Sequence, residues 1–495
     1  MLSYIKKPFL ILSTAVVLMT GCSKEDVIEL VPEFTFDGIT NPSSMDQVEQ
    51  VLLGAYTGFR SADYYGSGSG TGNAWGMMND VISDNFYETI ESLANSRTMA
   101  DWLYNAETGQ IASSYTAAYQ VISRANIVLR DVDKFTTATN TKMANRIKGQ
   151  ALAIRALAHF DLFRYFANRY DRNSTTELAV AYMTEFAVST AIKPTRLNNK
   201  DFYDKVLADI SAALPLLADV DRAINAPGAV RPYIDANAAY ALQARVYLYA
   251  GLYPEAITAA TAAINNRPLT TGQAAFSGLY NQTSVNAGEI IWNVQFESNQ
   301  SGPTFLAFFA TNNRSYFRPA PEVVTATGTS GLIQSNDIRY SAYFTNIGGA
   351  PAITKYKGKG GLSDGNANFI VFRTGEMYLI RAEARALSSQ EGLALDDLNA
   401  LRAARIDGYV PVSGLTGAAL LEAIANERRA ELIGEGHRFF DLKRTTRTLV
   451  RGAVCGTATS VAGDCDLAPA DREWAWPIPV ASTRINPGMV QNPNY

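Results

Sequence analysis

Histidine, cysteine and charge are all scarce in this chain. Its 495 residues include 2 histidines and 3 cysteines, and only 18% are Asp, Glu, Lys or Arg. These histidines (His159 and His437) and cysteines are too few for zinc fingers, HExxH metalloproteases or cysteine-ligated iron–sulfur clusters. The net charge of −4 leaves no overall basic excess for nucleic acid. We therefore expect no metal site, no cofactor and no nucleic-acid partner.

Apolar and aromatic residues, in contrast, are plentiful. Hydrophobic residues make up 47% of the chain, which also contains 5 Trp, 25 Tyr and 22 Phe. This composition supports a large core and excludes wholesale disorder. At about 150 residues per domain, the length allows two to four domains or one body built from repeats. Because no later stretch has the composition of a linker, we expect a single body over residues 41–495.

The N-terminus has the pattern of an export signal. Two lysines precede an apolar run over residues 9–19, which is too short for a membrane span of about 20 residues. The sequence Met19-Thr20-Gly21-Cys22 resembles the lipobox of bacterial lipoproteins, in which cleavage before the cysteine is coupled to its lipid modification. We expect a signal peptide over 1–21, a lipid-modified Cys22 and a linker over 22–40. An ordinary secretory signal with an incidental cysteine is the alternative.

The residues after Cys22 bear on where the protein is displayed. Ser23-Lys24-Glu25-Asp26 resembles the acidic surface-export tag of lipoproteins in Bacteroidetes-type bacteria. A solvated linker would have the same composition and is the alternative interpretation of these four residues. Together with acyl chains on Cys22, it indicates a protein anchored in the lipid bilayer of the outer membrane and exposed at the cell surface.

Long amphipathic segments predict a mostly helical body. Ala, Leu and Tyr recur at spacings of three and four residues, as a packed helical face requires. The expected helices cover about 43–59, 111–133, 141–168, 200–218, 234–250, 253–266, 372–389, 394–405 and 417–445. Between about 270 and 370 the pattern is irregular, with one short strand at 289–296, and we expect a loop-rich insertion there.

The segment from Tyr247 to Pro268 resembles a tetratricopeptide repeat. Small residues at Ala250, Gly251 and Ala256 let two helices cross closely, and a proline ends the second helix. A less regular copy begins at Ala382. No strict period of about 34 residues is present, so unrelated helical hairpins are the alternative.

Motifs of a known family occur along most of the chain. Phe372–Ala384 resembles the R-x-x-E-x-Y-L-I-x-A-E-A helix of the SusD/RagB family, and Asn426–Arg444 resembles its E-R-R-x-E-L-x-x-E-G-x-R-x-x-D-L-x-R segment. The C-terminal Trp476–Pro479 and Ile485–Pro493 match the family's P-I-P, N-P and Q-N-P elements. Gly149–Leu162 matches the first family helix, with Gln where Glu is usual.

The resemblance implies both a fold and a function. The implied fold is mostly α, a tetratricopeptide-like helical scaffold with a loop-rich, minor-β region that binds ligand. The implied function is to bind a nutrient, usually a glycan, and deliver it to a SusC-like TonB-dependent transporter without catalysis. A receptor for peptide or protein nutrients in the same family is an open alternative. A glycoside hydrolase, the remaining alternative, would need two carboxylates about 5–10 Å apart. Asp80, Asp84 and Glu88 are the candidates. Acids at this helical spacing usually form a solvated helix face.

Aromatic side chains are the candidate ligand contacts, because sugars lay their C–H faces on aromatic rings. The glycines at 66–72 would let the backbone approach a ligand closely. The candidates near this loop and in the irregular segment are Tyr64, Tyr65, Trp75, Tyr87, Trp102, Tyr316 and Phe317. Packing in the core is the competing interpretation of such residues.

Two further features are interpreted as structural. In the charged run from Glu427 to Arg444, Arg428 and Glu431 are three residues apart, as are Asp441 and Arg444, and we expect ion pairs that hold the last helices together. Assigning Cys22 to lipid leaves Cys455 and Cys465 ten residues apart. In an oxidising compartment we expect these two to form a disulfide that closes a surface loop.

Overall fold

The computed structural model describes most of the chain after the expected signal and linker. The described residues are 40–66, 74–186, 192–222, 231–282, 287–297, 315–362, 365–452, 455 and 465–495. Cys22, predicted to carry lipid, and most of the glycine-rich loop at 66–72 lie outside them.

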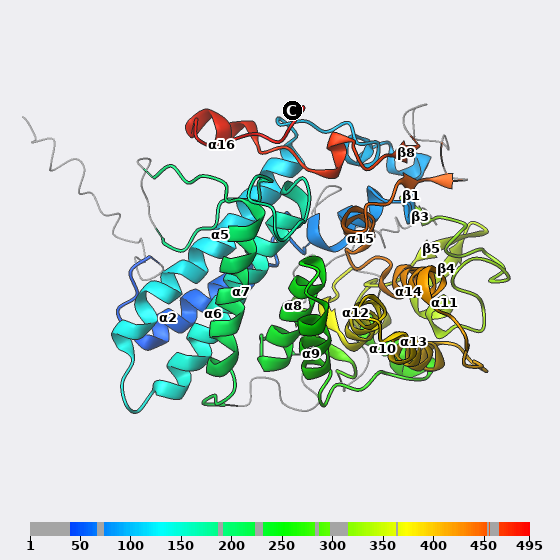
Figure 1. Cartoon of the computed structure of the whole chain (residues 1–495), viewed down its shortest axis with the longest axis horizontal. Helices are drawn as coiled ribbons and strands as arrows, with labels where there is room; N and C mark the ends of the chain where they lie inside the picture. The colour runs from blue at the N-terminus through cyan, green and yellow to red at the C-terminus, as the bar shows by residue number, and fades with distance from the viewer. Residues whose placement is uncertain are drawn as a thin grey trace, which may run out of the picture.

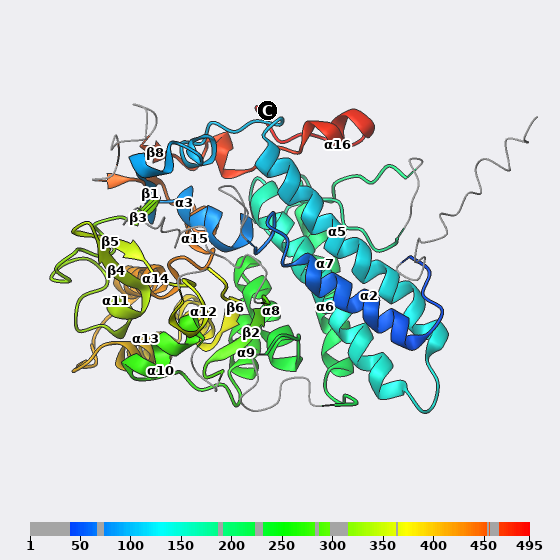
Figure 2. The same ribbon diagram turned by 180° about the vertical axis from the view of Figure 1, so that it is seen from behind.

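Four long helices form one half of the molecule (Figures 1 and 2). They are α2 (Met45–Gly58), α5 (Gly109–Asp131), α6 (Thr141–Phe166) and α7 (Asn199–Leu216). Helix α6 packs against both α5 and α7, and α2 packs on α5. Every side chain of α6 from Gly149 onward is buried, so α6 is the central helix of this half. None of the described helices combines the length and apolar character needed to span a bilayer.

Polar residues at the predicted helix starts act as N-caps. The Ser44 hydroxyl accepts a hydrogen bond from the Gln47 N–H at 3.3 Å, and the Gln47 side chain accepts one from the Ser43 N–H at 2.7 Å. Asn198 caps α7 by accepting from the Asp201 N–H at 2.8 Å. Each cap satisfies a backbone donor that the helix leaves unpaired. The starts of α2 and α7 therefore lie within two residues of the predicted positions.

The other half stacks helical hairpins in a tetratricopeptide-like manner. Its helices are α8 (Ala236–Tyr249), α9 (Tyr253–Ala263), α12 (Thr374–Leu387), α13 (Glu391–Arg405) and α14 (Gly417–Leu432). Helix α8 pairs with α9, and α12 packs against both α9 and α13. Gly251 has a φ of +69° in the turn between α8 and α9, where a residue with a Cβ would be strained. The predicted fold class is confirmed.

One predicted helix, over 417–445, is in fact two. Helix α14 ends at Leu432, and α15 (Arg438–Arg444) follows in a new direction. Between them Gly436 has a φ of +84°, which a helix cannot accommodate. A Cβ at this position would also collide with the carbonyl oxygen of Trp75. Glycine therefore both breaks the helix and lets the turn press against a distant backbone segment.

The sheets formed by the described residues each have two antiparallel strands. They pair β1 (Phe86–Glu88) with β3 (Phe317–Pro319), β2 (Ile290–Val294) with β6 (Phe369–Arg373), β4 (Phe344–Ile347) with β5 (Ala350–Ile353), and β7 (Leu449–Val450) with β8 (Asp466–Leu467). Strand β2 falls within the predicted 289–296. The irregular segment at 270–370 also holds two short helices, α10 (Gln273–Asn281) and α11 (Ile338–Tyr343), which the sequence pattern did not predict.

Short elements form a layer along one edge of the molecule, the upper edge in Figure 1. Strands β1, β3 and β8 lie there with α16 (Val480–Ile485) and the C-terminus. The structure joins Cys455 to Cys465 in a disulfide beside the β7–β8 pair, with their Cα atoms 5.4 Å apart. That separation is within the range found for disulfides.

Candidate ligand-binding face

The β1–β3 ribbon sorts its side chains onto two faces. Its cross-strand pairs are Phe86 with Pro319, Tyr87 with Arg318, and Glu88 with Phe317. The first and last of these pairs are buried, whereas Tyr87 and Arg318 are half-buried. Because side chains alternate along a strand, Tyr87 and Arg318 share the other, half-buried face of the ribbon, where the Tyr87 side chain also packs against the edge of the hydrophobic core.

Tyr316 extends this half-buried face. The Thr89 N–H donates a hydrogen bond to the Tyr316 carbonyl oxygen at 2.9 Å, which continues the pairing beyond the ends of β1 and β3. Tyr316 is two residues from Arg318, so it lies on the same face and diagonally across from Tyr87. Diagonal side chains on antiparallel strands are about 7–8 Å apart. We call the side of the ribbon that carries Tyr87, Tyr316 and Arg318 the tyrosine face. Its residues come from distant parts of the chain.

Arg318 also fixes the ribbon to its neighbour. Its Nη1 donates hydrogen bonds to the carbonyl oxygens of Ala350 and Pro351, at 2.9 and 3.1 Å. Its Nε and Nη2 make no hydrogen bond to any described residue, so they can donate to a ligand. Sequence reasoning missed Arg318, because a single arginine near Tyr316 acquires meaning only when the strand pairing is known.

Tyr64, Tyr65 and Trp75, predicted to contact ligand, lie in the core. Their exposed fractions are 0%, 1% and 1%. Both tyrosine hydroxyls donate to Oδ2 of Asp161 at 2.8 Å, and the Trp75 ring centroid lies 4.3 Å from that of Tyr64. The expectation that these rings form a sugar platform is wrong, because their faces pack against protein and not solvent.

Trp102 and Phe317 are core residues as well. The Trp102 indole N–H donates to the carbonyl oxygen of Ile82 at 2.9 Å, and the Arg451 guanidinium covers its ring at 3.9 Å. Phe317 lies on the inward side of β3 and is 1% exposed. Both expectations are wrong for the same reason. Of the seven predicted residues, Tyr87 and Tyr316 are the two that the structure brings together on an accessible face.

The carboxylates considered for hydrolysis are engaged by the protein itself. Asp80 and Glu88 accept hydrogen bonds from backbone N–H groups at 3.0 and 2.9 Å. Asp84 pairs with Arg438 at 2.8 Å. All three are buried, so they give no support to glycoside hydrolysis.

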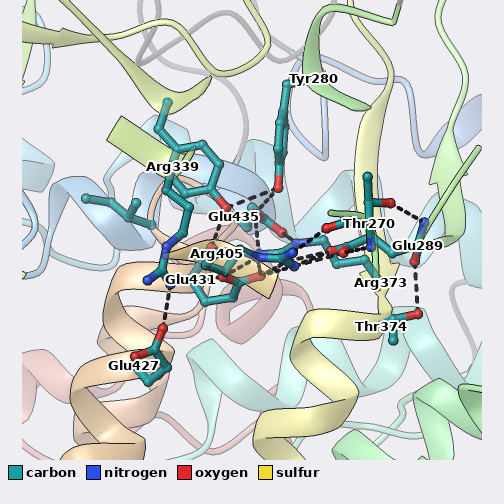
Figure 3. Close-up of polar contacts among 12 residues, drawn as sticks. Thr270, Tyr280, Glu289, Arg339, Arg373, Thr374, Arg405, Glu427, Glu431 and Glu435 are labelled. Atoms are coloured by element: carbon teal, nitrogen blue, oxygen red, sulfur yellow. Dashed lines mark hydrogen bonds and ion pairs between the residues drawn. The ribbon is translucent and has the colours of Figure 1, made fainter. Parts of the chain in front are cut away.

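A group of buried charged side chains lies where β6, α13 and α14 meet (Figure 3). We call it the central ion cluster, and its members are Glu289, Asp337, Arg339, Lys355, Arg373, Arg405, Glu427, Glu431 and Glu435. All nine are buried. Glu431, on α14, lies at its centre and contacts three arginines, Arg405 at 2.8 Å, Arg339 at 3.0 Å, and Arg373.

The central ion cluster fixes helices together and leaves no charge unpaired. Its five carboxylates face four cations within the cluster, and Arg402 adds a fifth by pairing with Glu427 at 2.7 Å. A buried charge without a partner would be costly, whereas a balanced network specifies one arrangement. The predicted Asp441–Arg444 pair is confirmed at 2.9 Å, but Arg428 pairs with Asp441 at 2.8 Å and not with Glu431.

Acid is expected to weaken the fold through these carboxylates. Burial by itself would raise the pKa of Glu431, but Arg405, Arg373 and Arg339 hold it well below its ordinary value. Burial would also raise the pKa of Glu435, but Arg373 and Lys355 lower it below its ordinary value. A carboxylate with a lowered folded pKa stabilises the fold above its unfolded pKa, about 4.3 for Glu, and this contribution is lost as pH falls further. Urea unfolding at pH 7, 5, 4 and 3 should therefore show a steep loss of stability below about pH 4.5.

The described residues offer no site for a metal ion. No three of their His, Cys, Asp or Glu side chains are grouped so that they could hold one. The Nε2 of His159 accepts from the Met183 N–H at 2.9 Å, and burial lowers its pKa to about 3. Burial and the neighbouring Arg245 also hold the pKa of His437 well below its usual range. Both histidines are therefore neutral packing residues.

Two family models match this chain. One, described as the SusD family, matches residues 312–495, and the other, described as starch-binding associating with outer membrane, matches residues 47–248. The chain is thus similar to SusD-family proteins in both its N-terminal and its C-terminal part. The second description associates the matched family with starch binding and with the outer membrane.

Individual SusD-like proteins resemble the chain over nearly its whole length. SusD-like protein P38 of Formosa agariphila is 24% identical, and the alignment covers 98% of each chain. A solved structure from Bacteroides vulgatus, described as a sugar-binding protein, is 26% identical with a TM-score of 0.78, covering 91% of this chain and 99% of that one. A SusD superfamily protein from Bacteroides thetaiotaomicron shares the fold, with a TM-score of 0.77 at 23% identity over 91% of this chain and 100% of that one.

Proposed function

We propose that this SusD-like protein binds an oligosaccharide or polysaccharide on its tyrosine face and delivers it to a TonB-dependent outer-membrane transporter. The observation that supports this most strongly is the placement of Tyr87 opposite Arg318, with Tyr316 diagonally across from Tyr87 on the same face of the β1–β3 ribbon. The sugar-binding description of the 26% identical relative from Bacteroides vulgatus agrees with it.

The chemistry of the tyrosine face suits a sugar. Pyranose rings present apolar C–H faces, which pack on aromatic rings, and hydroxyls, which need donors and acceptors. Tyr87 and Tyr316 supply two rings and two hydroxyls, and Arg318 supplies guanidinium N–H groups beside them. Because Arg318 is anchored to the Ala350 and Pro351 carbonyl oxygens, its free N–H groups are already oriented and lose little entropy when a ligand binds.

Removing either ring is expected to weaken glycan binding. Tyr87→Ala and Tyr316→Ala should each raise the Kd for an oligosaccharide roughly tenfold, since an aromatic contact contributes about 0.5–1.5 kcal/mol and 1.4 kcal/mol corresponds to tenfold. The oligosaccharide is first chosen by screening the wild-type protein on a glycan array. Isothermal titration calorimetry then measures the Kd of each variant.

The matched control is Tyr378→Ala, which removes a half-buried tyrosine from α12, outside the tyrosine face. It should bind like the wild type. If both ribbon variants bind like the control, the ligand site lies elsewhere. If the wild type binds peptides and no glycan on parallel arrays, the peptide-receptor alternative takes the place of this proposal.

Anchoring and delivery complete the proposed function. A lipid-modified Cys22 would hold the protein at the outer membrane, and the residues from Cys22 to Thr40 would connect the lipid to the folded body. Delivery requires a transporter nearby, which fits the association with the outer membrane described for the family. Purification from membranes should therefore recover a TonB-dependent barrel with the wild-type chain. Recovery of the chain alone under mild detergent would count against delivery.

A further inference from the structure

A concave site lies where the end of α6, the α8–α9 turn and the end of α15 meet. Its volume is about 320 Å³, and it shares no lining residue with the tyrosine face. The charged side chains that line it are Arg169, Asp171, Arg172, Lys443, Arg444 and Arg447. Five cations and one carboxylate therefore face the same hollow, which we call the cationic pocket.

The acids that balance three of these cations do not line the pocket. Arg172 pairs with Asp204 at 2.6 Å, and Arg444 binds Glu383 at 2.7 Å. Arg447 pairs with an acid on α14, Glu422, at 2.9 Å. Each of these three arginines is thus paired with an acid that lies outside the pocket lining, so the acids add no negative charge to that lining.

Lys443 and Arg169 have no carboxylate partner among the described residues. The Lys443 ammonium donates to the carbonyl oxygens of Arg164 and Ala167 at 3.0 and 2.6 Å, at the end of α6. Burial, followed by repulsion from Arg169, lowers the pKa of Lys443. Arg169 and Lys443 both line the cationic pocket, so an anion bound there would lie beside both side chains.

Two donors that belong to the pocket residues are left over, the Nε of Arg172 and the hydroxyl of Tyr249, which has no hydrogen-bond partner among the described residues. The Nε of Arg172 is buried and makes no hydrogen bond within the described part of the chain. Buried donors are nearly always paired in proteins. The same guanidinium already uses Nη2 to bind Asp204, which fixes its orientation beside the pocket.

The turn after α15 carries backbone strain at the pocket. Thr446 lines the pocket and has a φ of +55°. The Arg447 N–H donates to the Leu442 carbonyl oxygen at 3.0 Å, which closes the kind of helix end where glycine is usual. A β-branched residue is disfavoured in that conformation. The threonine at this position places its hydroxyl, a further hydrogen-bond donor, at the rim of the cationic pocket.

We propose that the cationic pocket binds an oxyanion, a sulfate or phosphate group, free or carried as an ester on a sugar. Such a group offers acceptors to Arg169, Arg172, Lys443 and the Thr446 hydroxyl at once, and guanidinium groups match its geometry. Its charge offsets the two cations that have no carboxylate partner. The proposal is independent of glycan binding at the tyrosine face, because the two sites share no residue.

Calorimetric titration of inorganic sulfate and inorganic phosphate into the full-length protein tests this directly. We expect saturable binding of at least one of them, with chloride at matched ionic strength giving none. Arg169→Gln, at an exposed residue whose side chain bonds to none of the described residues, should weaken binding at least tenfold. Arg484→Gln, which removes an exposed arginine from α16, is the charge-matched control and should bind like the wild type.

Thr446→Gly separates binding from folding. It should raise the melting temperature, because glycine accepts the positive φ, and it should weaken oxyanion binding several-fold. Galactose 6-sulfate and glucose 6-phosphate, compared with galactose and glucose, show whether the group is taken as a sulfate ester, a phosphate ester or the free ion. Absence of binding by every oxyanion, or equal binding by the Arg169 and Arg484 variants, would overturn the proposal.

Discussion

Glu431→Ala is expected to destabilise the protein more than any other single substitution in the central ion cluster. Glu431 is fully buried and contacts Arg339, Arg373 and Arg405. Without it, three buried guanidinium groups lose their shared carboxylate, and removing one partner of a buried ion pair costs about 3–5 kcal/mol. Urea unfolding followed by circular dichroism measures this change in the free energy of unfolding.

The control for Glu431→Ala is Glu255→Ala, which removes an exposed glutamate near the start of α9. A surface substitution of this kind should change the free energy of unfolding by about 0.5 kcal/mol or less. Glu431→Gln keeps the size and some hydrogen bonds of the side chain but not its charge, so its effect should fall between the two. A Glu431→Ala protein as stable as the Glu255 variant would show that the cluster does not hold the helices together.

Asp161→Ala is expected to have an effect of similar size in the other half of the molecule. Asp161 accepts hydrogen bonds from the hydroxyls of Tyr64 and Tyr65, both at 2.8 Å, and pairs with Arg164. Its loss leaves two hydroxyls and a guanidinium buried without that partner, which costs about 3–5 kcal/mol. Thermal and urea unfolding should both show the loss.

Tyr64→Phe tests the same contact more gently. It removes one hydroxyl and leaves the ring, so it should cost only about 1 kcal/mol and leave ligand affinity unchanged. Weaker glycan binding by a Tyr64→Phe protein of normal stability would contradict the assignment of this tyrosine to the core. It would restore Tyr64 to the ligand site.

Long helices with continuous apolar spacing were the part of the fold that the sequence could predict. Helix α6 was expected at 141–168 and spans Thr141–Phe166, because its apolar spacing is continuous and its start follows a turn. The hairpin from Tyr247 to Pro268 was recognisable because its small residues and its proline act locally. Such signals depend on neighbours within a few residues, and these are visible in a sequence.

The ligand face could be predicted only in part, because it depends on long-range pairing. Tyr64 and Tyr65 resembled surface tyrosines beside a glycine-rich loop, yet their hydroxyls bind Asp161, which is nearly 100 residues away in the chain. Tyr87 meets Tyr316 only through the register of β1 with β3. The partner of Arg428 was missed for a similar reason, since the break at Gly436 brings Asp441 back toward it.

The central claim is that the tyrosine face is the ligand-binding site. Its most direct test is calorimetric titration of an array-selected oligosaccharide into the wild-type protein and into the Tyr87→Ala, Tyr316→Ala double variant. Melting temperatures of the two proteins are measured first, and the comparison is made when they are equal. We expect wild-type binding to be saturable and the double variant to lose affinity by about a hundredfold, the product of two tenfold effects. Equal affinity of the two proteins would contradict the claim.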